Sequence, residues 1–527
     1  MNALELLVWI IPLLCAIGAA LASRRDPLRI AKWTTLLAAI FASGFVLFRI
    51  LGGAIEFLAQ SARAPETSNP VLDGSASAML LLVTGLGAVI ARYSATYLAG
   101  QRGLERYSGS LLLALASVTS LVISDHLGVI VAAWAMAGMC VHVLLTFYRE
   151  RPQAEAAARK KFLLSRLADV SLFSSLLLIQ SEVGSLRLGA IGAFAQSHEV
   201  LSSRLHLATV LFALGVVLKS AQLPFHGWMT QVMEAPTPVS ALLHAGIVNI
   251  GGFLLIRLHA LFVHAWLAQG LLVAFGLATA IAGTLVMTTR VSIKVSLAWS
   301  TISQLGFMLV QCGLGMWHIA LLHLLAHSVY KAHAFLRAGS VVEAWKQASF
   351  VKTGEVSVAA IAFGTAIAFA ASSLVAWFCS ALLPEATVSI WGSAVVISMS
   401  LGGSLARTLG GGWRATARLF LFSTASCVSY VALHAYFGKW LPELREESVF
   451  FARHGCAIAG LCGLYVVHTL VYVRPHALWW RQVQPELFGG FFLDEWLARV
   501  AHRLWTPRSA IARVSVHRLT KQRGASR

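Results

Sequence analysis

Long apolar runs, separated by short polar segments, make up most of the chain. Fifteen runs come close to the length of about 20 residues that crosses a bilayer as a helix. They lie at residues 4–22, 30–50, 77–91, 108–123, 127–147, 162–180, 205–223, 238–258, 266–288, 293–313, 317–337, 356–383, 388–406, 415–437 and 451–473. The pattern predicts an all-α integral membrane protein with about 15 transmembrane helices, and the run at 356–383 is long enough to be bent or broken.

Composition agrees with this fold class. Hydrophobic residues make up 58% of the chain and charged residues only 12%, whereas a soluble domain keeps roughly 25% of its residues charged. So few charges cannot cover a water-facing surface, so we expect lipid to surround the chain.

Basic residues gather in every second loop between the runs. The basic loops carry Arg24, Arg25, Arg29 and Lys32; Arg92, Arg102 and Arg106; Arg149, Arg151, Arg159, Lys160 and Lys161; Arg290 and Lys294; Lys346 and Lys352; and Arg407, Arg414 and Arg418. The segments 56–73, 181–204 and 442–447, which lie between basic loops, are acidic or neutral. The positive-inside rule then places the N-terminus outside and the C-terminus in the cytoplasm.

The net charge of +19 fits a membrane surface better than a nucleic acid. The Lys and Arg residues lie in loops and in the tail at 476–527, and none forms a basic block beside an aromatic platform for single strands. The tail mixes basic residues with tryptophans, which predicts a segment that lies on the inner leaflet or docks on a cytoplasmic partner.

Lys219 is an isolated charge at the end of an apolar run. Charged groups inside a membrane cost about 2.5–3.5 kcal/mol each on insertion scales, so they are functional candidates. Pro224 follows five residues later and should break the helix, which frees carbonyls to face a polar cavity. Because burial disfavours the charged form of a lysine, Lys219 is a candidate proton carrier; the alternative is a side chain that snorkels to the interface.

More ionisable residues follow in the next runs. His244 and Lys294 come first, and His323, His327 and Lys331 are spaced so that they share one helix face. Histidine changes its protonation near neutral pH, so such a row suits proton transfer.

Three other interpretations of the histidines remain: a metal site, a haem site and ordinary core histidines. A metal site usually needs a carboxylate nearby, and Glu234 is the single acidic residue between Ser202 and Glu343. Arg166 and Asp169, three residues apart, could pair with each other, or Asp169 could reach Lys219.

Three stretches resemble the signature of the antiporter-like subunits, the proton-translocating membrane subunits of respiratory complex I and of multisubunit sodium/proton antiporters. They are KSAQLPFHGWMTQVMEAPTPVSALLHA at 219–245, KVSLAWSTISQLG at 294–306 and HLLAHSVYK at 323–331. The resemblance covers about residues 77–410. It implies two inverted five-helix repeats with broken helices and half-channels.

The same resemblance implies roles for the ionisable residues. Lys219 would be the central proton-carrying lysine. The residues that would continue a polar axis along the membrane plane are His244, Lys294, His323, His327 and Lys331.

The chain departs from the family pattern in both halves. The family's fifth helix has a glutamate after a tryptophan, but Ala135 follows Trp134 here. The second broken helix of the family has a proline pair followed by a lysine, and the matching stretch at 364–380 has neither. Whether Asp169 or His142 replaces the missing carboxylate is open at this point.

A short chain with these departures, and with the run at 226–238, resembles the membrane subunit of the Dab-type complexes that accumulate dissolved inorganic carbon. The resemblance implies a bacterial inner-membrane subunit without a cofactor of its own. Its partner would be a large cytoplasmic, carbonic-anhydrase-like zinc subunit that hydrates CO2 to bicarbonate, and this chain would supply proton or sodium movement. One alternative is a subunit of complex I or of a multisubunit antiporter; another is a redox enzyme with haem on His323 and His327.

Four regions follow from these patterns. We expect an N-terminal helix pair with an external loop at 1–76, an antiporter-like core at 77–410, C-terminal transmembrane helices at 411–475 and a basic amphipathic cytoplasmic tail at 476–527.

Overall fold

The computed structural model describes most of the chain. The described residues are 6–23, 26–59, 73–148, 150–198, 200–340, 357–382, 448–495 and 499–500, with short pieces between 391 and 432. The predicted runs at 388–406 and 415–437 therefore lie largely outside them.

Helices form nearly all the regular structure of the described residues. The long ones are α2 (Ile10–Leu21), α3 (Pro27–Ala59), α4 (Gly74–Tyr97), α5 (Leu104–Ile123), α6 (Leu127–Leu145), α7 (Pro152–Val183), α9 (Ser203–Lys219), α14 (Trp266–Met287), α15 (Ile293–Gly313), α16 (Trp317–Leu336), α18 (Val358–Leu382) and α21 (Ser448–Val473). The shorter ones are α8 (Leu188–Ser197), α10 (Gly227–Gln231), η1 (Val232–Glu234), α11 (Thr237–Ala245), η2 (Ile247–Asn249), α12 (Ile250–Arg257), α13 (His259–Phe262), η3 (Ala338–Ser340), α22 (Leu478–Phe488) and η5 (Gly490–Phe492).

Eleven helical segments of the described chain are long and apolar enough to cross a membrane. The predicted class, an all-α multi-pass membrane protein, is therefore confirmed. The run at 356–383 is a single helix, α18, without the break that its length suggested, because it contains no proline.

The beginning of α7 differs from the prediction. The run was expected to start at 162, but the helix begins at Pro152. Proline suits the first turn of a helix, and the alanines Ala154, Ala157 and Ala158 bury the added turns against neighbours. Lys160 and Lys161, expected in a loop, consequently lie inside a helix and are only 4% and 5% exposed.

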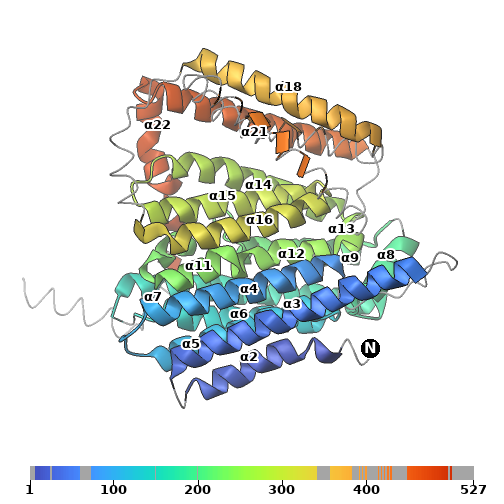
Figure 1. Cartoon of the computed structure of the whole chain (residues 1–527). Helices are drawn as coiled ribbons and strands as arrows, with labels where there is room; N and C mark the ends of the chain where they lie inside the picture. Colours follow the sequence, from blue (N-terminus) through green and yellow to red (C-terminus); the bar gives the residue numbers. More distant parts are fainter. Residues whose placement is uncertain are drawn as a thin grey trace, which may run out of the picture.

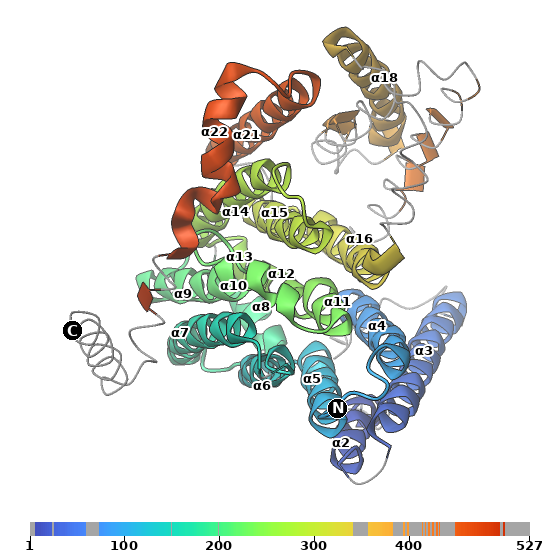
Figure 2. The same cartoon turned by 90° about the vertical axis from the view of Figure 1, so that its left-hand side faces the viewer.

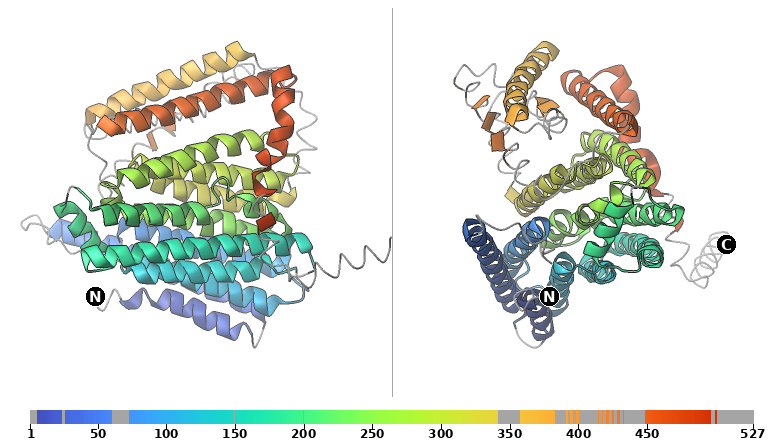
Figure 3. Two further views of the ribbon diagram at one scale, coloured as in Figure 1. Left: turned by 180° about the vertical axis from the view of Figure 1, so that it is seen from behind. Right: turned by 90° about the vertical axis from the view of Figure 1, so that its right-hand side faces the viewer.

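The helices run side by side, with α9 to α12 in the middle of the bundle (Figures 1 and 2). The helices α5, α6 and α7 flank this middle on one side and α14, α15 and α16 on the other, as the view from the opposite end also shows (Figure 3). We call the end where α7, α11 and α15 begin the basic end, because Arg151, Arg159 and Arg290 lie there. The helix α2 begins at the opposite end, and α22 lies across the basic end (Figure 1).

Two helical paths in the middle are interrupted. The helix α9 stops at Lys219, and the chain continues through residues 220–236 with only α10 and η1 as short turns. The path from Thr237 to Arg257 is split at Gly246, where φ is −123° and ψ is −73°. Irregular backbone at membrane depth is tolerated only inside protein or beside a polar cavity, so these interruptions mark the region where a site is expected.

Candidate functional site

Lys219 lies in a buried cluster of charges between α7 and α9. Its Nζ atom is 2.6 Å from Oδ1 of Asp169, and the two side chains are 6% and 8% exposed. The other carboxylate oxygen of Asp169 is 2.7 Å from Nη2 of Arg166. One carboxylate thus serves two cations on different helices, and both pairings considered from the sequence are present.

The packing of α7 against α9 holds this cluster in place. The hydroxyls of Ser171 and Ser175 donate to the carbonyls of Leu211 and Ala208, each at 2.7 Å. These hydrogen bonds link the helices directly, since both acceptors belong to α9.

Asp169, and not a residue of α6, supplies the carboxylate that pairs with Lys219. Trp134 of α6 packs its ring 4.3 Å from Lys219 Nζ, and the next residue, Ala135, has no charge to offer. His142 lies elsewhere: its Nδ1 is 3.2 Å from the carbonyl oxygen of Ala158, and its ring packs on Phe162. Of the two candidates, the structure therefore brings Asp169 to Lys219.

Lys161 is a member of this cluster that the sequence did not single out. Its Nζ atom donates to the carbonyl of Gly138 at 2.5 Å. A Cβ atom on Gly138 would lie 3.5 Å from Lys161 Nζ and 3.9 Å from Arg166 Nη2, so the two cations face the same spot on α6. Its place directly after Arg159 and Lys160 made it look like a loop residue, although its spacing of eight from Asp169, two helical turns, was a usable signal.

The segment after Lys219 carries Pro224 and Glu234 away from the cluster. The amide of Leu223, next to Pro224, donates to Thr279 Oγ1 at 3.1 Å, which ties the interruption to α14. Glu234 is 3.1 Å from Arg151 at the basic end, and its side chain is 36% exposed. The supporting role of Glu234 in the cation path stays a prediction.

His244 lies in the middle of the bundle on α11. It is 0% exposed, and its ring stacks on Phe335 with 4.4 Å between centroids. Neither ring nitrogen has a hydrogen-bond partner among the described residues. It is within electrostatic reach of Lys331.

The three ionisable residues of α16 form a row. The rings of His323 and His327 are 5.9 Å apart, and His323 Nδ1 is 2.9 Å from Gln311 Oε1. Lys331 is fully buried, and its Nζ donates to the carbonyl of Leu297 at 3.3 Å.

The row itself runs along α16, because residues four apart on one helix stack along the helix axis. The polar axis along the membrane plane that the resemblance implies, which joins residues of several helices, stays a prediction. The helix α16 runs from one end of the bundle to the other (Figure 1), and the row from Lys331 to His323 covers part of its length. Lys294 lies apart from it at the basic end, where its Nζ donates to Thr237 Oγ1 at 2.9 Å.

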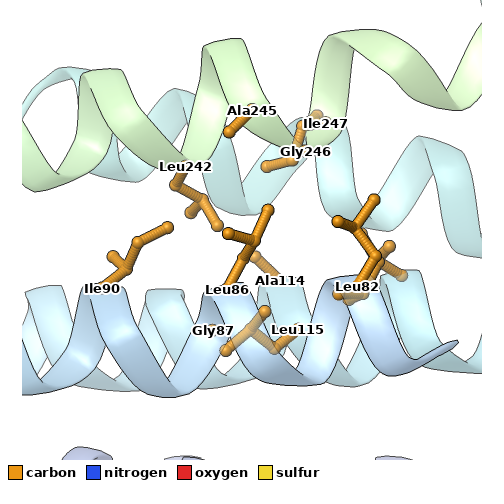
Figure 4. A pocket seen from close by; sticks show the side chains of 12 residues that line it. Leu82, Leu86, Gly87, Ile90, Ala114, Leu115, Leu242, Ala245, Gly246 and Ile247 are labelled. Carbon is orange, nitrogen blue, oxygen red and sulfur yellow. The ribbon is translucent and has the colours of Figure 1, made fainter. Parts of the chain in front are cut away.

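An apolar pocket lies beside the interruption at Gly246 (Figure 4). Leu82 and Leu86 of α4, Leu115 of α5 and Leu242 of α11 are among its lining residues. It offers no charged group to an ion. Among the described residues, no group of three His, Cys, Asp or Glu side chains is placed to hold a metal ion.

The buried pair of Lys219 and Asp169, the row on α16 and the interrupted helices agree with the resemblance to antiporter-like membrane subunits. The family described as "NADH:quinone oxidoreductase/Mrp antiporter, TM" matches residues 124–406. The "Probable inorganic carbon transporter subunit DabB" of Hydrogenovibrio crunogenus is 34% identical over 520 residues, which covers 95% of both chains. The chain belongs to this antiporter-like family and, within it, to the DabB subunits.

Similarity to other antiporter-like subunits is more local. NADH-quinone oxidoreductase subunit L of Escherichia coli is 36% identical over 276 residues, which is 52% of this chain and 45% of that protein. The structure of the Mrp complex from Dietzia sp. DQ12-45-1b has a chain with the same fold. Its TM-score is 0.54 at 23% sequence identity, and the match covers 99% of this chain and 59% of that one.

Proposed function

We propose that this chain is the cation-conducting membrane subunit of an energy-coupled complex that accumulates inorganic carbon. Its partner would be a large cytoplasmic, carbonic-anhydrase-like zinc subunit, and proton or sodium movement through this chain would drive CO2 hydration there. The observation that carries the proposal is the buried pair of Lys219 and Asp169 at the end of an interrupted helix. Full-length similarity to DabB subunits supports the choice of complex.

The shared carboxylate gives this cluster a way to switch. While Lys219 is charged, Asp169 bridges it and Arg166. When Lys219 gives up its proton, Arg166 can keep the carboxylate, because a guanidinium stays protonated. The lysine is then free to move toward residues 220–236 and to take up a new proton. Asp169 would thus serve as the carboxylate partner of Lys219 in place of the glutamate that α6 lacks.

The row on α16 supports a second part of the path. His244 and Lys331 lie within electrostatic reach of each other, and His327 and His323 continue toward the end opposite the basic end. Histidine and lysine side chains can accept and donate protons in turn. We assign these residues to proton transfer along α16.

A subunit of complex I or of a multisubunit antiporter is the second candidate. The local identity to subunit L favours it, but that match covers only 45% of the larger protein. Purification from native membranes distinguishes the two candidates. One large zinc-binding partner would support the carbon complex, and a set of several membrane subunits would contradict it.

Replacement of Lys219 tests the conducting role. We expect Lys219→Ala to insert at the wild-type level and to abolish cation-dependent accumulation of labelled inorganic carbon in cells that carry the whole complex. The control is Lys32→Ala, which removes a lysine from the N-terminal helix α3. Wild-type accumulation by Lys219→Ala at equal membrane abundance would show that Lys219 is not on the path.

A further inference from the structure

The described part of the tail lies across the basic end of the bundle as a strap. We define the C-terminal strap as residues 478–495, which comprise α22, Gly489, η5 and the three residues after η5. It leaves α21, passes the end of α14 and reaches the region of α10 and α7 (Figure 2). A tail that only touched lipid would not need to cross the helix ends.

Arg290 fastens the middle of the strap. Its Nη2 atom donates to the carbonyl of Leu487 at 3.2 Å. Its guanidinium lies 5.4 Å from the ring of Trp299 and 5.4 Å from the ring of Phe488, so it is held between the bundle and the strap. Stacking of this kind uses the planar shape of arginine.

Asp494 fastens the end of the strap to two elements at once. Its Oδ2 atom is 2.7 Å from Lys160 Nζ of α7 and 2.8 Å from Gln231 Nε2 of α10. The side chain of Lys160 is 5% exposed and that of Asp494 is 26% exposed. Because a buried cation is costly without a partner, this pair is a built contact between residues 334 positions apart.

Gly227 makes room for this carboxylate. A Cβ atom at Gly227 would lie 1.6 Å from Asp494 Oδ1, so a side chain at this position would expel Asp494. The Oδ1 atom is itself buried and has no hydrogen-bond partner among the described residues. The beginning of α10 is therefore shaped around the end of the strap.

The segment that Asp494 holds is the one that follows Lys219. Residues 220–236 have little regular structure of their own, and Gln231 and Gly227 are among the residues of this segment that lie against the strap. We propose that Asp494 is a positioning residue that clamps α10 to α7 and so fixes the interruption on which Lys219 depends. This inference rests on the function proposed above for Lys219.

The experiment combines a structural and a functional measurement on the complete complex. Asp494→Asn removes the charge of the side chain, and Asp494→Glu keeps it. The matched control is Glu495→Gln, which removes the charge of the next residue, an exposed glutamate. Hydrogen–deuterium exchange of residues 220–236 reports the clamp, and accumulation of labelled inorganic carbon per molecule reports activity. We expect Asp494→Asn to speed exchange about tenfold and to lower activity about tenfold, Asp494→Glu to restore most of both, and Glu495→Gln to change neither.

Two outcomes would overturn the inference. Unchanged exchange in residues 220–236 would show that Asp494 clamps nothing, and faster exchange with full activity would show that the clamp does not position the path. If Asp494→Asn fails to insert, the double variant Lys160→Met/Asp494→Asn is used, because it also removes the lysine that would be left without its partner. We expect the same changes in exchange and activity from it. Lys219→Ala in the same assay tests the proposed function separately, since full activity there would contradict that function whatever Asp494 does.

Discussion

Asp169 pairs with two cations, Arg166 and Lys219. Because the carboxylate can keep one partner when the other changes, its role extends beyond stabilising the fold. Arg166 is three residues away on the same helix and 34% exposed, whereas Lys219 belongs to α9 and is 6% exposed. The arginine can hold the carboxylate without help from α9. The lysine depends on Asp169, because among the described residues it is the carboxylate that pairs with Lys219.

We predict that Asp169→Asn impairs ion-coupled activity about as severely as Lys219→Ala. The asparagine cannot balance the charge of Lys219, and removal of one partner from a buried pair is costly, about 3–5 kcal/mol. Activity per molecule and the amount of protein in the membrane are measured together. Lower abundance with unchanged specific activity would indicate a pair that only helps folding.

The double variant gives a sharper result at the same site. We expect Asp169→Asn combined with Lys219→Ala to be no worse than either change alone, because residues that act as one unit have non-additive effects. Losses that multiply would mean that the two residues act independently.

At the scale of elements, α14 and α15 are joined by close backbone contact. A Cβ atom on Gly276 would lie 2.6 Å from the carbonyl oxygen of Gly306, and a Cβ atom on Gly306 would lie 2.6 Å from that of Gly276. Small residues let membrane helices approach in this way, since van der Waals packing is a main source of their association. The pair keeps α15, and with it Lys294 and Gln311, at a fixed distance from the interrupted segment tied to α14.

We predict that Gly306→Val lowers thermal stability and membrane abundance, because the valine would have to push α14 away from α15. Gly270→Val on α14 is the control, since a Cβ atom there has nothing within 4 Å. The midpoint of thermal unfolding in detergent is the measurement. Equal midpoints for the two variants would contradict the close packing.

Element positions were largely predictable from hydropathy, and the exceptions have a physical cause. The start of α7 was missed because Lys160 and Lys161 look like loop charges, yet protein rather than water surrounds them. The row on α16 was found from its spacing alone. The polar axis between helices that the resemblance implies stays a prediction.

At the scale of the whole molecule, the sequence identifies single functional candidates better than it identifies which residues contact each other. Lys219 is conspicuous because no other charge lies in its apolar run. Its partner Asp169 is 50 positions earlier and was one candidate of two, and the pair of Lys160 and Asp494 spans 334 positions. Contacts at such distances depend on how helices pack, and one sequence does not contain that information.

The division of labour between subunits can be tested on the isolated chain. We predict that it binds no stoichiometric zinc, because its histidines lack the carboxylates and thiolates that zinc sites use. Metal analysis of the purified subunit, with the intact complex as a positive control, makes the measurement. One firmly held zinc ion per chain would overturn the division.

The orientation of the row on α16 has an electrical consequence. Lys331 and His323 are eight residues apart, which is about 12 Å along a helix and roughly 40% of a hydrocarbon core of about 30 Å. Moving one elementary charge across the whole membrane at 100 mV changes its electrical energy by about 2.3 kcal/mol. A proton that moves only along this row therefore changes its electrical energy by about 0.9 kcal/mol. Transfer between His244 and Lys331, on neighbouring helices, runs mainly sideways and changes that energy little. Voltage should therefore alter the rate of the step along α16 most, and clamping the potential in vesicles would reveal which step limits the flux.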